Sequence, residues 1–488
     1  MENFPQSAIG LPATLKYELP PSLSDNARSY AVAVAPDGIS LVTGTAIANP
    51  FTAASGGSIA PFVQNIVSFT IPCGQGAGIF LDPRDTILNF RLSWTISTTF
   101  AGGTANFTNM IGSASSWFDS LTLYHNNTPL EIVQNYNLLF NQLLNATVNS
   151  SERQGSIGIC MGCDDNTNAG IDLPPGVTGS AGTYYFNFAI PLISIIGLNS
   201  DKLIPVGSIQ NLQLQMMTAA TVPVAFYGGS TAPTSGAFGA PVLDQFTLNM
   251  KYVDIGQQAS ALLSQTLQDG KWFIKSKTYT NSNALLAQGS SGTTSLLLQI
   301  RNSSINSLYF QFGTSGKPLV CPNGNYDAVN PALIGLQCSV GGNKFPNKQL
   351  NVCQRPAEAY SVYAQAWGAS SVKGYGGVMS RSGFGAAYPL YAGGDNMGVL
   401  PGTALRVASN SDTTTQNVVS YPNMCYLGFD LQRVSGSLFS GINTRSTPPY
   451  LDLNIGSATL APLTCFAWGM SDVVLVIDVP SKHIQAFV

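Results

Sequence analysis

The amino-acid sequence predicts an all-β protein in which two similar barrel-type domains follow one another. Three observations lead to this prediction. Short segments that alternate apolar and polar residues recur along most of the chain, which is the periodicity of half-buried strands. Helical periodicity is rare, and two short segments show it together with an aromatic and apolar face. The pattern of strands around the first helical segment returns around the second, so a repeated β domain is expected.

The expected strands are rich in β-branched and aromatic residues, and clusters of Gly, Pro, Asn and Ser separate them. They lie at 66–71, 87–96, 118–124, 184–190, 212–216, 246–253, 294–300, 308–312, 450–455 and 473–479. Many short strands with turn-rich spacers are typical of a sandwich or barrel.

The first helical segment carries the signals of a helix start. Thr128 has the position of an N-cap, Pro129 that of the first helical residue, and Glu131 completes a capping box. An apolar face follows at helical spacing, formed by Ile132, Tyr136, Leu139, Phe140 and Leu143. The sequence therefore predicts a helix that begins at Thr128.

The second helical segment begins at Arg355-Pro356 and repeats the spacing P-x-E-x4-Y-x3-aromatic. Strand segments repeat around it in the same order. The matches pair LNFRL (88–92) with LYFQF (308–312), LTL (121–123) with LQC (336–338), LQL (212–214) with LDL (451–453), and Asp244 with Asp472. Because loops of different length can separate equivalent strands, we interpret this pattern as one domain present twice.

The repeat sets the predicted domain boundaries. We expect an irregular N-terminal arm at 1–60, a first barrel at 61–256, a linker at 257–271 and a second barrel at 272–488. The arm is expected to become ordered on neighbouring chains. Long loops at 147–183 and 368–424 follow the two helices, and structureless loops of this length are often functional.

The composition favours close packing against other copies of the chain. Charged residues make up only 9% of the 488 residues, against roughly 25% in an average soluble protein. A weakly charged surface repels its own copies little. The net charge of −3, with Lys16 and Arg28 the only basic residues among the first 60, argues against a direct, sequence-specific nucleic-acid partner.

No catalytic or metal-binding constellation emerges from the sequence, and no cofactor is expected. Cys160 and Cys163 form a CxxC, but no second CxxC or His pair accompanies it, so structural thiols are favoured over a metal or redox site. Neither histidine, His125 nor His483, has the context of a catalytic base. The glycines of CGQGAG (73–78) lack a lysine and a following helix, which favours a turn.

Two carboxylate pairs keep a β-rich hydrolase open as an alternative. Asp82 and Asp85 are best interpreted as part of a turn before a strand, because Asp-Pro favours turns. Asp164 and Asp165 lie in a Gly- and Asn-rich segment and could contact a metal ion, although a solvated loop is the simpler interpretation.

Targeting signals are not evident in the sequence. The N-terminus lacks the basic and apolar regions of a signal peptide, and no apolar run approaches the roughly 20 residues that span a bilayer. We therefore expect synthesis in the cytosol, with free thiols. The five glycosylation sequons, at Asn106, Asn126, Asn145, Asn149 and Asn302, are then expected to be fortuitous.

With this repeat, the chain resembles the double jelly-roll major capsid proteins of small eukaryotic double-stranded DNA viruses. These are the virophages, Polinton-like viruses and adintoviruses, within the wider hexon lineage. The residues that carry the resemblance are IVSFTIPCGQGAGIFLDPRDTILNFRLSW (66–94) and FDSLTLYHNNTPLEIVQNYNLLFNQLL (118–144), and the duplicated architecture covers about 60–488.

The resemblance implies two tandem eight-stranded jelly-roll barrels, each with a short helix and long loops. It further implies a non-enzymatic virion protein that forms homotrimers, whose six barrels make pseudo-hexameric blocks of an icosahedral shell. Expected partners are neighbouring capsomers and penton and minor capsid proteins. The alternative is a tandem jelly-roll carbohydrate-binding or spike protein, because jelly rolls also serve those functions.

Overall fold

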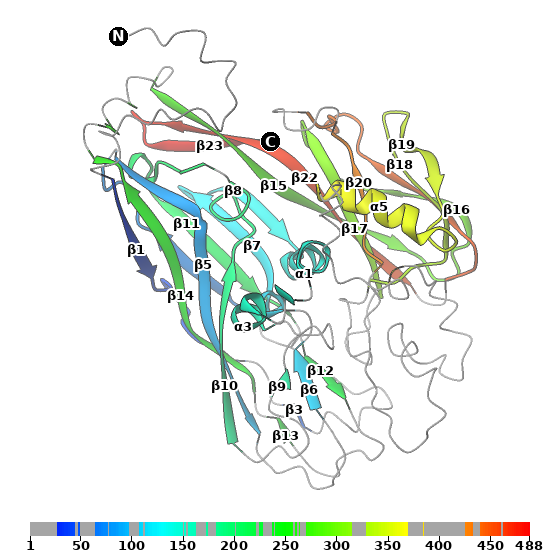
Figure 1. The fold of residues 1–488 in the computed structure, drawn as a ribbon, viewed down its shortest axis with the longest axis horizontal. Coiled ribbons are helices and arrows are strands. Elements are labelled where there is room, and N and C mark those ends of the chain that lie inside the picture. Colours follow the sequence, from blue (N-terminus) through cyan, green and yellow to red (C-terminus); the bar gives the residue numbers. More distant parts are fainter. Residues whose placement is uncertain are drawn as a thin grey trace.

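Antiparallel strands dominate a computed structural model of the protein (Figure 1). Along most of these strands, buried side chains alternate with more exposed ones. Pairs of sheets enclose the apolar side of each strand, as expected for a β protein with buried faces. The structure describes residues 27–43, 47–48, 64–76, 78–96, 107–110, 113–149, 151–152, 155–162, 172–173, 182–200, 202–220, 224–227, 237–238, 240–256, 259–260, 263, 270–314, 328–368, 384, 425–432, 440–459 and 462–488.

The first barrel consists of two facing four-stranded sheets. One has the order β1-β14-β5-β10, and the other has the order β4-β11-β7-β8. Their bounds are β1 (Arg28–Val34), β4 (Ile66–Ile71), β5 (Ile79–Ile96), β7 (Phe118–His125), β8 (Thr128–Gln134), β10 (Gly182–Pro191), β11 (Leu212–Thr218) and β14 (Val242–Asp254).

Short elements extend the first barrel. The strands β2 (Val42–Thr43), β3 (Ile47–Ala48) and β13 (Ala237–Phe238) join the sheet of β14 and β5. A small separate sheet has the order β12-β6-β9, formed by β12 (Val224–Tyr227), β6 (Phe107–Met110) and β9 (Asp172–Leu173). Two 3-10 turns, at Ala114–Trp117 and Val206–Ser208, lie in the connections.

The second barrel repeats this arrangement. Its sheets have the orders β15-β22-β17-β20 and β16-β21-β18-β19, and β23 adds to β22. The bounds are β15 (Lys271–Leu286), β16 (Gly292–Leu297), β17 (Ile305–Thr314), β18 (Leu333–Val340), β19 (Asn343–Leu350), β20 (Leu427–Asp430), β21 (Tyr450–Ile455), β22 (Leu463–Asp478) and β23 (His483–Phe487).

Strand for strand, the two barrels correspond. In one sheet, β1, β14, β5 and β10 have the positions of β15, β22, β17 and β20. In the other, β4, β11, β7 and β8 have the positions of β16, β21, β18 and β19. The prediction of two tandem eight-stranded barrels is therefore confirmed.

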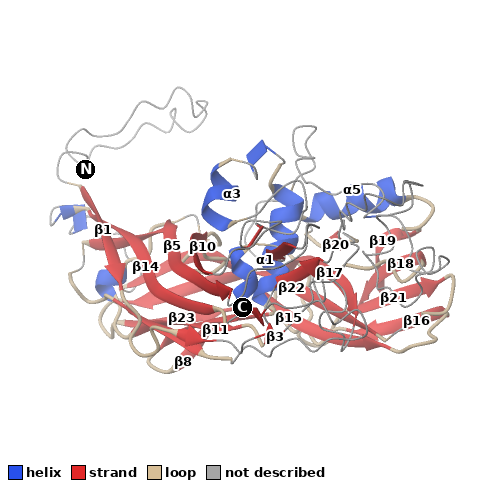
Figure 2. Ribbon diagram, turned by 90° about the horizontal axis from the view of Figure 1, so that it is seen from below, coloured by secondary structure: helices blue, strands red, loops and turns tan. Residues whose placement is uncertain are grey.

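A helix follows the fifth strand of each barrel. These helices are α1 (Tyr136–Thr147) and α5 (Pro356–Ala366), and a shorter helix, α3 (Ser156–Met161), comes after α1. Figure 2 shows all three on the same side of the sheets. Pro356 occupies the first turn of α5, as the sequence predicts.

The predicted helix start at Thr128 is wrong. Thr128, Pro129 and Glu131 belong to strand β8, and α1 begins only at Tyr136. The reason is the preceding turn: Asn126 and Asn127 both have positive φ, at 48° and 62°, and such a pair favours a tight hairpin. The hairpin continues β7 into β8, and this pairing overrides the local capping signal.

The expectation of an irregular arm is wrong for part of residues 1–60. Residues 28–34 form β1, an edge strand that pairs with β14 along its whole length. The sequence RSYAVAV contains mostly small side chains, so its apolar alternation is weak. The described residues do not include 1–26, 49–63 and most of the loops 147–183 and 368–424. The expectations for these segments are therefore not tested by the structure.

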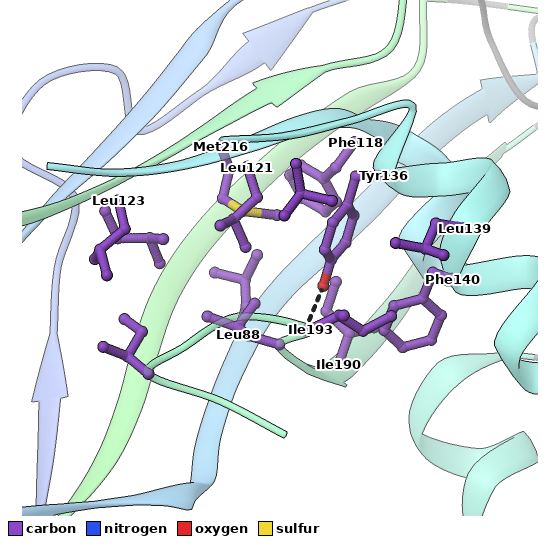
Figure 3. Packing of buried hydrophobic residues seen from close by; sticks show 14 of the residues in the cluster. Leu88, Phe118, Leu121, Leu123, Tyr136, Leu139, Phe140, Ile190, Ile193 and Met216 are labelled. Atoms are coloured by element: carbon purple, nitrogen blue, oxygen red, sulfur yellow. Dashed lines mark hydrogen bonds between the residues drawn. The ribbon is translucent and has the colours of Figure 1, made fainter. Parts of the chain in front are cut away.

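The apolar core continues from the first barrel into the second. One cluster contains first-barrel residues such as Leu88, Leu121 and Leu214 together with residues of the second barrel. The second-barrel members include Ile274, Tyr279, Tyr309, Trp468, Val473, Leu475, Ile477 and Ile484. A second cluster fills the rest of the second barrel. Figure 3 shows Tyr136, at the start of α1, among Phe118, Ile190 and their neighbours.

The fold makes a testable prediction at Gly207, where the connection to β11 passes close to the β4–β5 connection. A Cβ on Gly207 would overlap with the carbonyl oxygen of Gly76. We expect Gly207→Ala to lower the free energy of unfolding by about 1–3 kcal/mol, because the backbone at Gly207 or at Gly76 must move to make room for the new Cβ. Gly38→Ala is the matched control, since a Cβ there meets nothing within 4 Å. Equal stability of the two variants in urea unfolding would contradict the prediction.

Candidate functional site: the junction between the barrels

The residues singled out in the sequence do not form one reactive centre. Asp82 and Asp85 lie on β5, with carboxylate oxygens 3.9 and 2.8 Å from Nζ of Lys251. Cys160 is an exposed thiol on α3, whereas Cys163, Asp164 and Asp165 lie outside the described residues. Within the described part of the chain, no group of three or more His, Cys, Asp or Glu residues could hold a metal ion.

Two of the sequon asparagines are buried in the structure. The side-chain amide of Asn145 donates to the hydroxyl of Tyr426 at 2.9 Å. The amide of Asn302 donates to Thr280 at 2.9 Å and to Ser471 at 2.5 Å. Both amides therefore serve internal packing in the folded protein. Asn106 lies among residues whose side chains are not described.

A buried carboxylate, that of Glu131, lies at the boundary between the barrels. Only 3% of Glu131 is exposed. Its Oε2 accepts hydrogen bonds from Ser194 Oγ at 2.5 Å and from the Ile195 N–H at 2.9 Å. Its Oε1 accepts from Thr278 Oγ1 at 2.9 Å. Since Thr278 belongs to β15, this carboxylate connects the two barrels.

Burial decides the protonation of this group. Removal from water raises the pKa of Glu131 from 4.5 to about 7, although the hydrogen bonds from Ser194, Ile195 and Thr278 act in the opposite direction. Near neutral pH, Glu131 is therefore divided between its neutral and ionised forms. Burial likewise raises the pKa of Tyr279, and the nearby Glu131 carboxylate adds to that shift.

A network of amides extends the junction from Glu131 to α1. Asn135, at the start of α1, donates to Asn281 at 3.0 Å and to Asn283 at 3.3 Å. On the next turns, Asn141 and Asn145 both donate to the Tyr426 hydroxyl, at 3.2 and 2.9 Å. These bonds use neutral donors and acceptors, so they fix the orientation of the barrels without burying further charge.

Backbone and aromatic contacts complete the junction. The Trp468 Nε1–H donates to the carbonyl oxygen of Gln134 at 3.1 Å. The Lys277 N–H and the Ser276 hydroxyl both donate to the carbonyl oxygen of Asn199, at 3.2 and 3.1 Å. Together with the shared apolar cluster, these contacts join the barrels as one body.

The two histidines of the chain meet at this boundary. His125, at the end of β7, is fully buried, and its ring centroid lies 4.7 Å from that of His483, at the start of β23. Burial, followed by the charge of His483, lowers the pKa of His125. Since a lowered pKa favours the neutral ring, His125 serves as a packing contact at neutral pH rather than as a charged site.

The polar groups of this site hold the two barrels together. The buried groups are paired with one another and point at the neighbouring barrel, not into an open cleft with a nucleophile and its base. The sequence pattern assigned Glu131 to a capping box and missed its role at the junction. Its partners Ser194 and Thr278 lie 63 and 147 residues away, so no local pattern could have indicated it.

Comparisons with known proteins place the fold. The sequence matches no protein-family model and no curated protein sequence. Its structure matches the PBCV-1 virus capsid, with 12% identity, a TM-score of 0.50 and coverage of 94% of this chain and 96% of that chain. A structure of PBCV-1 VP54, fitted into a reconstruction of the virophage Sputnik, matches with 13% identity, a TM-score of 0.51 and coverage of 94% and 97%.

The major capsid protein of mavirus matches with 9% identity and a TM-score of 0.50, over 99% of this chain and 93% of that chain. The chain has the double jelly-roll fold of these capsid proteins. At such low identity, the similarity concerns the fold. Within the described residues, no helix of the double jelly-roll protein is long and apolar enough to cross a membrane.

The junction makes a prediction about pH. The folded state holds the proton of Glu131 more tightly than the unfolded state, so this group's contribution to stability is complete below about pH 4.5 and is lost as pH rises through about 7. Glu131→Gln keeps the shape but cannot ionise. We expect the wild type to lose up to about 3 kcal/mol relative to this variant between pH 4.5 and 8.

The measurement is urea unfolding of both proteins across this pH range. Glu358→Gln is the matched control, because Glu358 is a partly exposed glutamate of α5 and its change should leave the pH dependence of the wild type intact. A constant difference in stability between wild type and Glu131→Gln at every pH would contradict the assigned role of Glu131.

Proposed function

We propose that this protein is a viral major capsid protein, of the type found in small eukaryotic double-stranded DNA viruses. The observation that carries the proposal is the junction: two equivalent barrels are joined by a shared apolar cluster and a buried polar network into one body. The capsid proteins of PBCV-1 and mavirus share this fold over at least 93% of their own chains.

The duplicated fold suits a particular assembly. Three chains supply six similar barrels, so a homotrimer can form a nearly hexagonal block that tiles an icosahedral shell. The weakly charged composition, with only 9% charged residues, supports close packing of such blocks. Neighbouring capsomers, and penton and minor capsid proteins, are the proposed partners.

Location and domain organisation follow from the same role. The protein would be made in the host cytosol and incorporated into the virion. It would have no catalytic site, cofactor or metal. The first barrel would extend through residue 256 and include β1, the linker would lie at 257–271, and the second barrel at 272–488. The PBCV-1 and mavirus structures with this fold are capsid proteins, so they do not favour the carbohydrate-binding or spike alternative.

The test is the solution mass of the purified protein by light scattering, combined with electron microscopy. We expect a particle of three times 51.4 kDa and, at high concentration, hexagonal arrays or shells. A protein that stays monomeric at all concentrations and forms no particles would contradict the proposal. Retention on a glycan array by such a monomer would instead support the carbohydrate-binding alternative.

A further inference from the structure

The strand β23 belongs to the second barrel but packs against the first. It pairs with β22 along its whole length. Ile484 is 3% exposed and belongs to the apolar cluster that the two barrels share, and Ala486 and Val488 pack against that cluster. β23 also contacts β8 of the first barrel (Figure 1). The strand therefore covers part of the junction between the barrels.

β23 also protects the stretch of β22 that the junction uses. On this side of β22, the strand β17 pairs only as far as Ser471, and β23 continues the pairing beside residues 474–478. Leu475 and Ile477, in the same stretch, belong to the shared apolar cluster. Release of β23 would leave the backbone N–H and C=O groups along this edge without a strand partner.

The two histidines of the chain meet where β23 begins. The ring of His125 is fully buried, and its centroid lies 4.7 Å from that of His483. Nδ1 of His125 has no hydrogen-bond partner within the described residues, and Nε2 lies 3.3 Å from the amide nitrogen of Asn126. Its neighbours in register, Leu212 of β11 and Thr128 of β8, are uncharged. A proton on this ring would place a positive charge in a buried site, which is costly.

The charged groups near the ring do not compensate this cost. His483 faces His125, and the exposed Lys482 precedes His483 in the chain. Asp478 of β22 lies in register with His483 rather than with His125. Burial is the largest influence and lowers the pKa of His125, and the charge of His483 lowers it further. The backbone of Lys482 and of Gln210 acts in the opposite direction without reversing the shift.

We propose that mild acid releases β23 from the first barrel, because a proton on the buried ring of His125 is accommodated only when that ring returns to water. At neutral pH the strand stays bound and the junction is closed. In acid, the released strand exposes the edge of β22 and the apolar side chains beneath Ile484. This inference goes beyond the proposed function and does not depend on it. In a capsid protein, the release would loosen the subunit when a particle enters an acidic compartment.

The direction of the effect follows from proton linkage. The bound form holds the proton of His125 less tightly than a released form, in which the ring has its ordinary pKa of 6.5. The contribution of this group to the bound form is therefore complete above about pH 6.5 and is lost as pH falls below that value. Glu131 has the opposite dependence, since its raised pKa favours the folded state in acid. Acid should thus release β23 without unfolding the barrels.

The far end of β23 does not share this sensitivity. The Arg445 guanidinium donates from Nη2 to the backbone oxygen of Val488 at 2.6 Å. Because an arginine stays charged throughout this pH range, that hydrogen bond does not change with the protonation of His125. Release should therefore begin at the His483 end of the strand.

Amide hydrogen exchange at about pH 7.5 and about pH 5.5, corrected for the intrinsic effect of pH on exchange, tests the release. We expect the protection of residues 483–487 to fall about three-fold or more in the wild type at the lower pH. The edge strand β1, whose seven residues include no histidine, is the internal control and should keep its protection. Equal protection of β23 at both pH values would overturn the inference.

Two variants assign the effect to one ring. His125→Gln keeps a polar side chain that cannot ionise, so the protection of β23 should no longer depend on pH. His483→Gln is the matched variant: it removes only the smaller influence on His125, so a weaker pH dependence should persist. A pH dependence that survives in His125→Gln and disappears in His483→Gln would contradict the assignment to His125.

A measurement on the wild type covers the case in which His125→Gln does not fold. Deuterium exchange at the ring C2–H, followed by mass spectrometry across pH, reports the titration of each histidine in its own peptide. The chain has only two histidines, so the two titrations are separable. We expect His125 to titrate below its ordinary pKa of 6.5, over the pH range in which β23 loses protection. A ring of His125 that titrates at the ordinary value would overturn the inference.

Discussion

The structure depends on the burial of one continuous apolar and polar junction between two barrels. The long strands β15 and β22 run past the body of the second barrel, and Ile274, Leu475 and Ile477 complete the core of the first. Hydrogen bonds of Glu131 and Asn135 then fix the relative orientation. Apolar burial supplies most of the attraction, and the polar groups select one arrangement, because an unmade bond in this place would be costly.

A carboxylate is an unexpected side chain at a buried junction between two barrels. Its burial penalises the charged form and raises the pKa of Glu131 to about 7. At the same boundary, the lowered pKa of His125 favours a neutral ring. Acid would remove the cost of ionised Glu131 but would add charge to the buried His125, so the two groups respond to pH in opposite directions.

Much of the fold could be predicted from the sequence. Strand alternation is visible within each short segment, and the repeat is visible when one part of the sequence is compared with another. LNFRL and LYFQF occupy corresponding strands, and Pro356 begins its helix as expected. The errors have physical causes. The Asn126–Asn127 turn favours a hairpin where a capping box suggested a helix. The strand β1, RSYAVAV, has too little contrast between apolar and polar residues to be detected. The junction could not be predicted, since its hydrogen bonds connect residues as far apart as Gln134 and Trp468.

A shared core and a buried polar network should make the two barrels one cooperative unit. Scanning calorimetry of the purified protein tests this most directly. We expect a single unfolding transition whose calorimetric enthalpy equals the van't Hoff enthalpy for the whole chain. Two separate transitions, one for each barrel, would contradict the joining of the barrels through this junction.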